Sequence, residues 1–115
     1  MEIKAFKGYR YNSEAAGDAG DCICPPYDVI DSEMRDALYN KSDYNAARIV
    51  RSKSFDSDTE EDNKYTRAGA ALAEWIEKGV VKQDDKDTVY AYVQDFDLGG
   101  NQCRRSGFVA LGKLR

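Results

Sequence analysis

The chain is organised around nine residues, Cys22-Ile23-Cys24-Pro25-Pro26-Tyr27-Asp28-Val29-Ile30. The two prolines fix their own φ angles, remove two backbone donors and disfavour helix at the residues before them. The backbone here is therefore expected to be extended and stiff. Such a segment can hold Tyr27 and Asp28 in one orientation, as a binding site requires. In the alternative interpretation the segment is a structural connector and Asp28 caps a turn.

Two helices are predicted after this segment. Asp31 or Ser32 offers an N-cap for the first, which ends near Asn40. Ser57 or Thr59 offers a cap for the second, and Gly79 closes it. The inward face of the second helix is expected to consist of apolar and aromatic residues at helical spacing: Tyr65, Ala68, Leu72, Trp75 and Ile76.

The other segments are predicted to be strands and loops. Residues 1–6 are expected to form a short strand with Ile3 directed inward, and residues 46–50 a second strand. Residues 13–21 and 51–58 lack apolar periodicity, so both are expected to be loops, the second of them mobile.

The C-terminal third predicts a β-hairpin. Residues 88–96 and 102–114 are rich in β-branched and aromatic residues, and Gly99-Gly100 between them suits a tight turn. Apolar groups on both faces favour a central position in a covered sheet. The predicted fold is α+β, with a small mixed or antiparallel sheet, a C-terminal hairpin and two helices packed on it. Residues 1–115 are expected to form a single domain, and the abrupt end after a strand suggests the N-terminal part of a longer protein.

Charge and composition exclude several functions. The net charge is −4, with 17 Lys and Arg against 21 Asp and Glu, so duplex nucleic acid is not an expected partner. No apolar run approaches the roughly 20 residues of a membrane span, and no signal peptide is evident, so we expect a soluble cytoplasmic protein without a membrane partner. The composition does not predict the oligomeric state.

Cysteine and histidine usage narrows the chemistry further. The three cysteines are expected to be reduced, because their number is odd and no secretory signal is present. The spacing of Cys22 and Cys24 is not that of zinc ligands, so no metal site is predicted. Histidine is absent, which excludes Ser-His-Asp and Cys-His nucleophile pairs.

One further candidate site residue follows the first predicted strand. Arg10 lies beside Tyr9, Tyr11 and Asn12, where the loop at the end of a strand commonly carries binding residues. A plain surface role for Arg10 is the open alternative.

Five motifs taken together resemble the N-terminal part of domain of unknown function family 1015, a bacterial and archaeal family loosely labelled ParB-like. The double-proline motif is the most specific of them, whereas Cys24 stands where the family usually has a small apolar residue. The motifs cover nearly the whole chain in the family's order: Phe6-Lys7-Gly8-Tyr9-Arg10-Tyr11-Asn12, Pro25-Pro26-Tyr27-Asp28-Val29-Ile30, Tyr44-Asn45, Asn63-Lys64-Tyr65-Thr66-Arg67-Ala68 and Arg105-Ser106-Gly107-Phe108-Val109-Ala110-Leu111.

The resemblance implies a ligand. The family distantly resembles the ParB and sulfiredoxin superfamily, which includes nucleotide-binding proteins and ATP-dependent kinases of free serine. ATP or another nucleotide is therefore the implied ligand or cofactor, with phosphate-binding and catalytic parts expected beyond residue 115. The residues expected to contact a small-molecule or nucleotide ligand are Arg10, Asn12, Tyr27, Asp28 and Asn45; the catalytic residues are left open. The alternative is a non-catalytic, ParB-like protein-interaction module.

Overall fold

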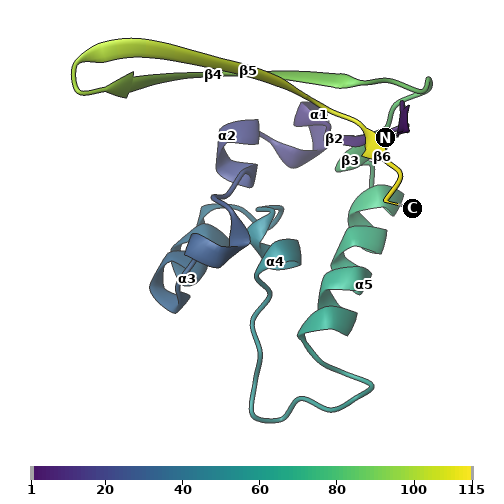
Figure 1. The fold of residues 1–115 in the computed structure, drawn as a ribbon. Helices are drawn as coiled ribbons and strands as arrows, with labels where there is room; N and C mark the ends of the chain where they lie inside the picture. Colours follow the sequence, from purple (N-terminus) through teal and green to yellow (C-terminus); the bar gives the residue numbers. More distant parts are fainter. Residues whose placement is uncertain (1, 115) are drawn as a thin grey trace. The chain divides into compact units, whose positions relative to one another are not determined.

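The computed structural model describes residues 2–114, which form two compact units. The helical unit is Arg10–Lys82, and the hairpin unit comprises residues 2–9 and 83–114. Helices and short antiparallel strand pairs make the fold α+β, as predicted (Figure 1). The expectation of a single domain stays a prediction.

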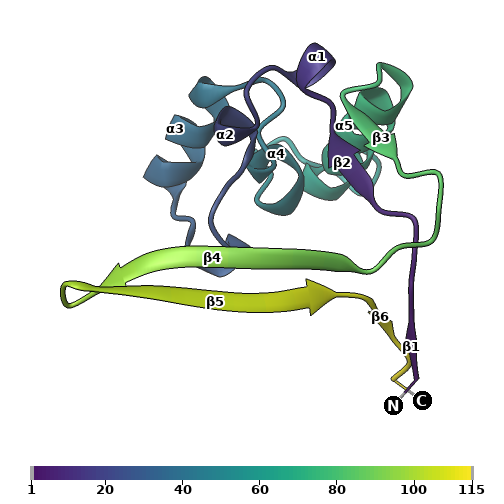
Figure 2. The same cartoon turned by 90° about the horizontal axis from the view of Figure 1, so that it is seen from above.

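The helical unit holds all the helices of the described chain. Its strand β2 (Tyr9–Tyr11) pairs with β3 (Val81–Gln83), and the chain passes from one unit to the other within these two strands. Between them lie α1 (Ser13–Ala16), α2 (Ala19–Cys22), the 3-10 helix η1 (Tyr27–Val29), α3 (Ser32–Lys41), α4 (Ala47–Val50) and α5 (Lys64–Glu77). Figures 1 and 2 both show α4 lying beside α5.

The two long helices form where they were predicted. Asp31 begins α3, and its side chain accepts a hydrogen bond from the Met34 N–H at 2.8 Å. The cap of α5 was predicted wrongly: the helix begins after Asn63, because the Asn63 side chain and Thr66 form a reciprocal capping box. Gly79 follows the end of α5 with φ 75°, as predicted for a terminating glycine.

The core of the helical unit gathers around the C-terminal half of α5. Trp75 is 5 % exposed and packs with buried residues of α1, α2 and the segment after α5: Ala16, Cys22, Val80 and Val81. The predicted inward face is correct for Trp75, whereas Leu72 and Ile76 are each 40 % exposed and Tyr65 is 75 % exposed. The core elements cover only part of this face of α5, so helical spacing alone overestimated how far burial extends.

Two predicted segments have a different structure. The segment predicted as a strand over residues 46–50 instead contains helix α4, and the buried Asn45 side chain just before it accepts from the Ala47 N–H at 2.9 Å. Residues 13–21 are not a loop: Asn12 and Asp18 cap the one-turn helices α1 and α2. A single turn is too short to show apolar periodicity.

The hairpin unit confirms the predicted C-terminal hairpin. Strand β4 (Tyr90–Leu98) pairs antiparallel with β5 (Asn101–Val109) over their whole length (Figure 2). Gly99 and Gly100 have φ 58° and 85°, the positive values that a type I′ turn requires at both positions. A second antiparallel pair joins β1 (Ile3–Lys4) to β6 (Leu111–Gly112).

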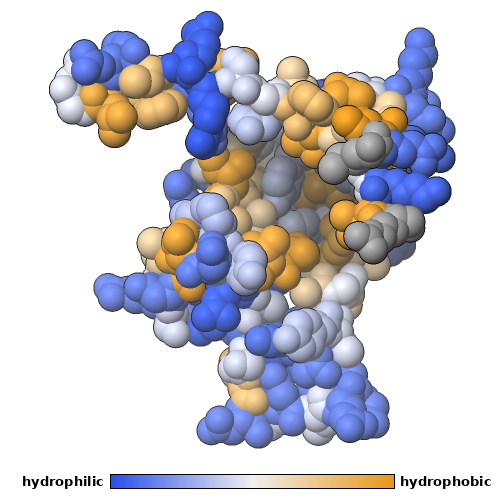
Figure 3. Space-filling view, viewed as in Figure 1, coloured by the Kyte–Doolittle hydropathy of each residue, from blue (hydrophilic) through white to orange (hydrophobic). Residues whose placement is uncertain are grey.

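The hairpin is not a central part of a covered sheet. Within residues 2–114, β4 and β5 pair only with each other. Apolar side chains near the tip, among them Phe96 and Leu98, are exposed. Figure 3 shows orange surface between hydrophilic neighbours over the hairpin. Ile3 is also exposed, contrary to its predicted inward direction. Apolar residues on both faces of a strand therefore did not indicate burial here.

Candidate functional site

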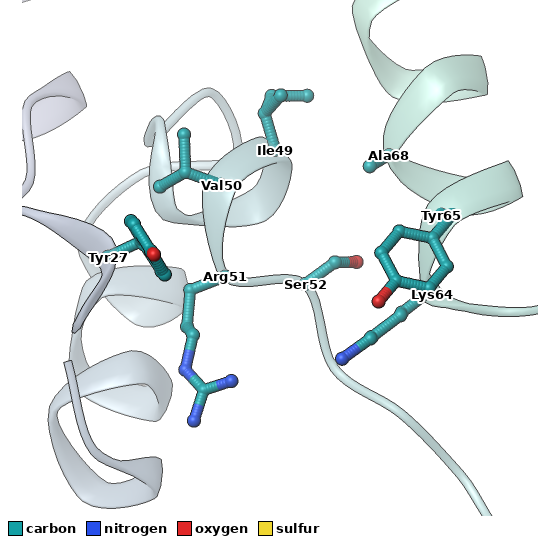
Figure 4. A pocket seen from close by; sticks show the side chains of 8 residues that line it. All are labelled: Tyr27, Ile49, Val50, Arg51, Ser52, Lys64, Tyr65 and Ala68. Carbon is teal, nitrogen blue, oxygen red and sulfur yellow. The ribbon is translucent and has the colours of Figure 1, made fainter.

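A pocket of about 240 Å³ lies in the helical unit where η1, the end of α4 and the start of α5 meet. Figure 4 shows its walls: Tyr27 and the end of α4 on one side, and α5 on the other. The pocket combines two tyrosine rings with their hydroxyls, a serine hydroxyl, two cations and an aliphatic patch. Its lining residues are Tyr27, Ile49, Val50, Arg51, Ser52, Lys64, Tyr65 and Ala68.

The double-proline segment places Tyr27 at this pocket. Pro26 has φ −54° and ψ 143°, and η1 begins directly after it. The segment is tied to α4 because the Ala46 N–H donates to the Cys22 carbonyl at 2.7 Å. Tyr27 itself remains 66 % exposed, so its ring is available to a ligand.

Arg51 provides the first cation. Its Nε donates to the Ile30 carbonyl at 3.2 Å, which holds the side chain beside η1. Arg51 is half-buried, and no carboxylate of the described residues forms an ion pair with it. Its two terminal nitrogens therefore remain able to donate to an anion.

Lys64 provides the second cation, from the first position of α5. Its Nζ lies 5.1 Å from the ring centroid of Tyr65, a cation–π contact. Lys64 is half-buried, and no described carboxylate pairs with it either. In Figure 4 the nitrogen atoms of Arg51 and Lys64 lie toward one side of the pocket, and Ile49 and Val50 lie toward the other.

The neighbouring acids are engaged elsewhere. Arg67 donates to Asp58 at 2.9 and 3.1 Å and to Asp62 at 3.2 Å. The Arg67 hydrogen bond, helped by the Phe55 N–H, lowers the pKa of Asp58. Lys53 pairs with Asp36 at 3.2 Å. The pocket lining therefore carries positive charge without a carboxylate.

The structure brings one sequence-predicted site residue, Tyr27, to this pocket. Asp28 is exposed in η1, is not part of the lining, and accepts no capping hydrogen bond there. Arg10 is exposed on β2. Asn12 is a structural residue, whose side chain donates to the Gly79 carbonyl at 3.0 Å and accepts from the Glu14 N–H. The ligand contacts expected of these residues stay predictions.

Asn45 is fully buried and holds the double-proline segment against α4. Its Nδ2 donates to the Asp21 carbonyl at 2.8 Å and the Ile23 carbonyl at 3.0 Å, while its Oδ1 accepts from the Ala47 N–H. Both amide donors are used inside the protein. Asn45 therefore positions the elements around the pocket and has no donor left for a ligand.

Cys22 and Cys24 lie close to Tyr11, which is partly buried. The Tyr11 hydroxyl donates to the Tyr44 carbonyl at 2.6 Å, and burial, together with the nearby Cys22 and Cys24, raises the pKa of Tyr11 to about 12. Burial also raises the pKa of the Cys24 thiol, which disfavours a nucleophilic thiolate. All three cysteines are free thiols. Among residues 2–114, no group of three or more His, Cys, Asp or Glu side chains could hold a metal ion.

Sequence reasoning predicted only Tyr27 among the eight lining residues and missed the other four polar or aromatic ones: Arg51, Ser52, Lys64 and Tyr65. Arg51 and Ser52 lie in the segment predicted as a mobile loop, and Tyr65 was assigned to the helix core. The available signal was the motif that contains Lys64 and Tyr65, which is part of the family resemblance.

Comparison with known proteins identifies the family. No curated protein and no solved structure matches the sequence. No helix within residues 2–114 is long and apolar enough to cross a membrane. The family model described as "Protein of unknown function (DUF1015)" matches residues 3–115, and the more distant ParB and sulfiredoxin relationship stays a prediction. Because that match extends over nearly the whole sequence, the chain belongs to the DUF1015 family.

Proposed function

We propose that the chain binds a nucleotide in the pocket between α4 and α5. One observation carries the proposal: two half-buried cations without a carboxylate partner, Arg51 and Lys64, share a pocket with the exposed rings of Tyr27 and Tyr65. A nucleotide supplies both a negative charge for the cations and a flat ring for a tyrosine.

The energetics favour an anion at this site. Partial burial weakens the hydration of a cation, so a cation without a counter-charge is less stable there than one that is paired. A phosphate accepts charge-assisted hydrogen bonds from Arg51 and Lys64. Stacking of a base on an aromatic side chain contributes about 1–3 kcal/mol.

The size of the pocket limits how much of the ligand it can enclose. Its volume of about 240 Å³ is smaller than the roughly 300–1,000 Å³ of pockets that enclose drug-sized ligands. We therefore expect part of the nucleotide to remain in solvent, and affinity to be modest.

The kinase reaction that the resemblance implies requires more than nucleotide binding. ATP-dependent phosphorylation of free serine requires a base for the attacking hydroxyl and stabilisation of the transferred phosphoryl group. The pocket lining offers cations that could stabilise the phosphoryl group, but no carboxylate that could act as the base. We propose nucleotide binding for this site, while phosphoryl transfer to serine remains an expectation from the resemblance.

Isothermal titration calorimetry tests the proposal. The chain is titrated with AMP, ADP, ATP and CTP, and the variants Arg51→Gln and Lys64→Gln are compared with Lys41→Gln, an exposed lysine outside the pocket. Loss of one charge-assisted contact, worth about 1.5–3 kcal/mol, should weaken binding at least roughly tenfold in the two pocket variants. Absence of binding to every nucleotide, or an equal loss in Lys41→Gln, would refute the proposal.

The interaction-module alternative has one feature in its favour. A two-stranded hairpin is marginally stable alone in water, and β4–β5 exposes Val93, Phe96, Leu98 and Phe108. Sedimentation velocity at increasing protein concentration, with and without AMP, separates the two functions. Self-association that AMP does not alter, together with no heat of nucleotide binding, would favour the interaction module.

A further inference from the structure

We infer that the α4–α5 pocket takes a phosphate monoester as the free anion, not as its magnesium complex. This inference rests on the proposed function and names the ligand class of the same site. It follows from the hydrogen-bonding character of the lining, the engagement of the neighbouring acids and the charge that the cations carry.

The polar groups that line the pocket are donors or hydroxyls. Arg51 and Lys64 can only donate, and Ser52, Tyr27 and Tyr65 contribute neutral hydroxyl groups. Magnesium in nucleotide sites is usually held by one or two carboxylates in addition to the phosphates and water. No carboxylate lines this pocket.

The acids of the loop that leads to α5 are already bound to cations. Arg67 holds Asp58 and Asp62, and the carbonyl of Lys53 accepts from Arg67 at 2.8 Å. Turning either carboxylate toward the pocket would break the contacts that connect this loop to α5. Asp28 follows the lining residue Tyr27 in sequence, but it is exposed and is not part of the lining.

The charge of the two cations matches a monoester. Arg51 and Lys64 together carry two positive charges, and a phosphate monoester carries about −1.5 to −2 at neutral pH. A magnesium ion on the phosphate would neutralise that charge and place a third cation beside Arg51 and Lys64. Repulsion of this kind disfavours the complex. Nucleoside monophosphates therefore fit the site better than the magnesium complexes of di- and triphosphates.

The test compares AMP and ADP by calorimetry, in EDTA and in excess MgCl₂ at matched ionic strength. We expect AMP affinity to change by less than about twofold and ADP affinity to fall by several-fold when magnesium is present.

Two outcomes are distinguishable. Binding that requires magnesium would overturn the inference and leave nucleotide binding standing. Absence of binding in both conditions would overturn nucleotide binding itself and the inference with it.

Discussion

Asn45→Ala tests how the double-proline segment is held. The substitution removes two hydrogen bonds to the carbonyls of Asp21 and Ile23 and one from the Ala47 N–H, at a position that is fully buried. Each intramolecular hydrogen bond contributes about 1 kcal/mol net, so we expect a loss of about 3 kcal/mol. This is a large fraction of the roughly 5–15 kcal/mol that stabilises a typical domain.

The assay is urea unfolding followed by the fluorescence of Trp75, the sole and buried tryptophan of the chain. Asn40→Ala is the matched control, because Asn40 is exposed on α3 and should change stability by less than about 0.5 kcal/mol. Asn45→Asp keeps the acceptor but places a carboxylate against two carbonyl oxygens. Its loss of unfolding free energy should therefore be larger at neutral pH, where the carboxylate is charged, than at acidic pH. An Asn45→Ala loss no larger than that of Asn40→Ala would refute the reasoning.

Three further predictions concern other parts of the chain. Gly107→Ala places a Cβ within 2.6 Å of the Tyr92 ring and should increase amide hydrogen exchange in the hairpin. Gly69→Ala lies in open space on α5 and should raise the free energy of unfolding by about 0.5–1 kcal/mol. Slower exchange in Gly107→Ala, or a less stable Gly69→Ala, would contradict the packing. Burial raises the pKa of Tyr11 to about 12, so the stability gained from its neutral phenol is present below the unfolded pKa of about 10 and lost as pH rises toward 12. Alkaline unfolding of the unmodified chain should therefore approach that of Tyr11→Phe in this window, and parallel pH curves would contradict the assignment. Burial also raises the pKa of Cys24, so iodoacetamide should alkylate it more slowly than an unstructured peptide thiol, as followed by mass spectrometry; an equal rate would argue against burial.

Local signals explain the elements that were predicted correctly. Asp31 at the start of α3, Gly79 after α5 and Gly99-Gly100 in the hairpin each determine a backbone conformation through their own chemistry. Such signals do not depend on the rest of the fold. The family resemblance rests on motifs that occur in a fixed order along the sequence, so it also did not depend on knowing the fold, and it was confirmed.

Tertiary contacts explain what the sequence did not predict. Ile49 and Val50 are β-branched and favour a strand, but the buried hydrogen bonds of Asn45 stabilise a helical turn instead. Tyr65 has helical core spacing, yet no core element covers that end of α5. The pocket exists because α4 and α5 lie side by side, a juxtaposition that no local pattern encodes.

The central claim is that the α4–α5 pocket is the ligand site, and its most direct test is a titration of the ¹⁵N-labelled chain with AMP, followed by amide chemical shifts. The account predicts that the largest changes fall on Tyr27, Arg51, Ser52, Lys64 and Tyr65, and that they disappear in Arg51→Gln. Changes centred on the hairpin unit, or none at saturating AMP, would contradict it.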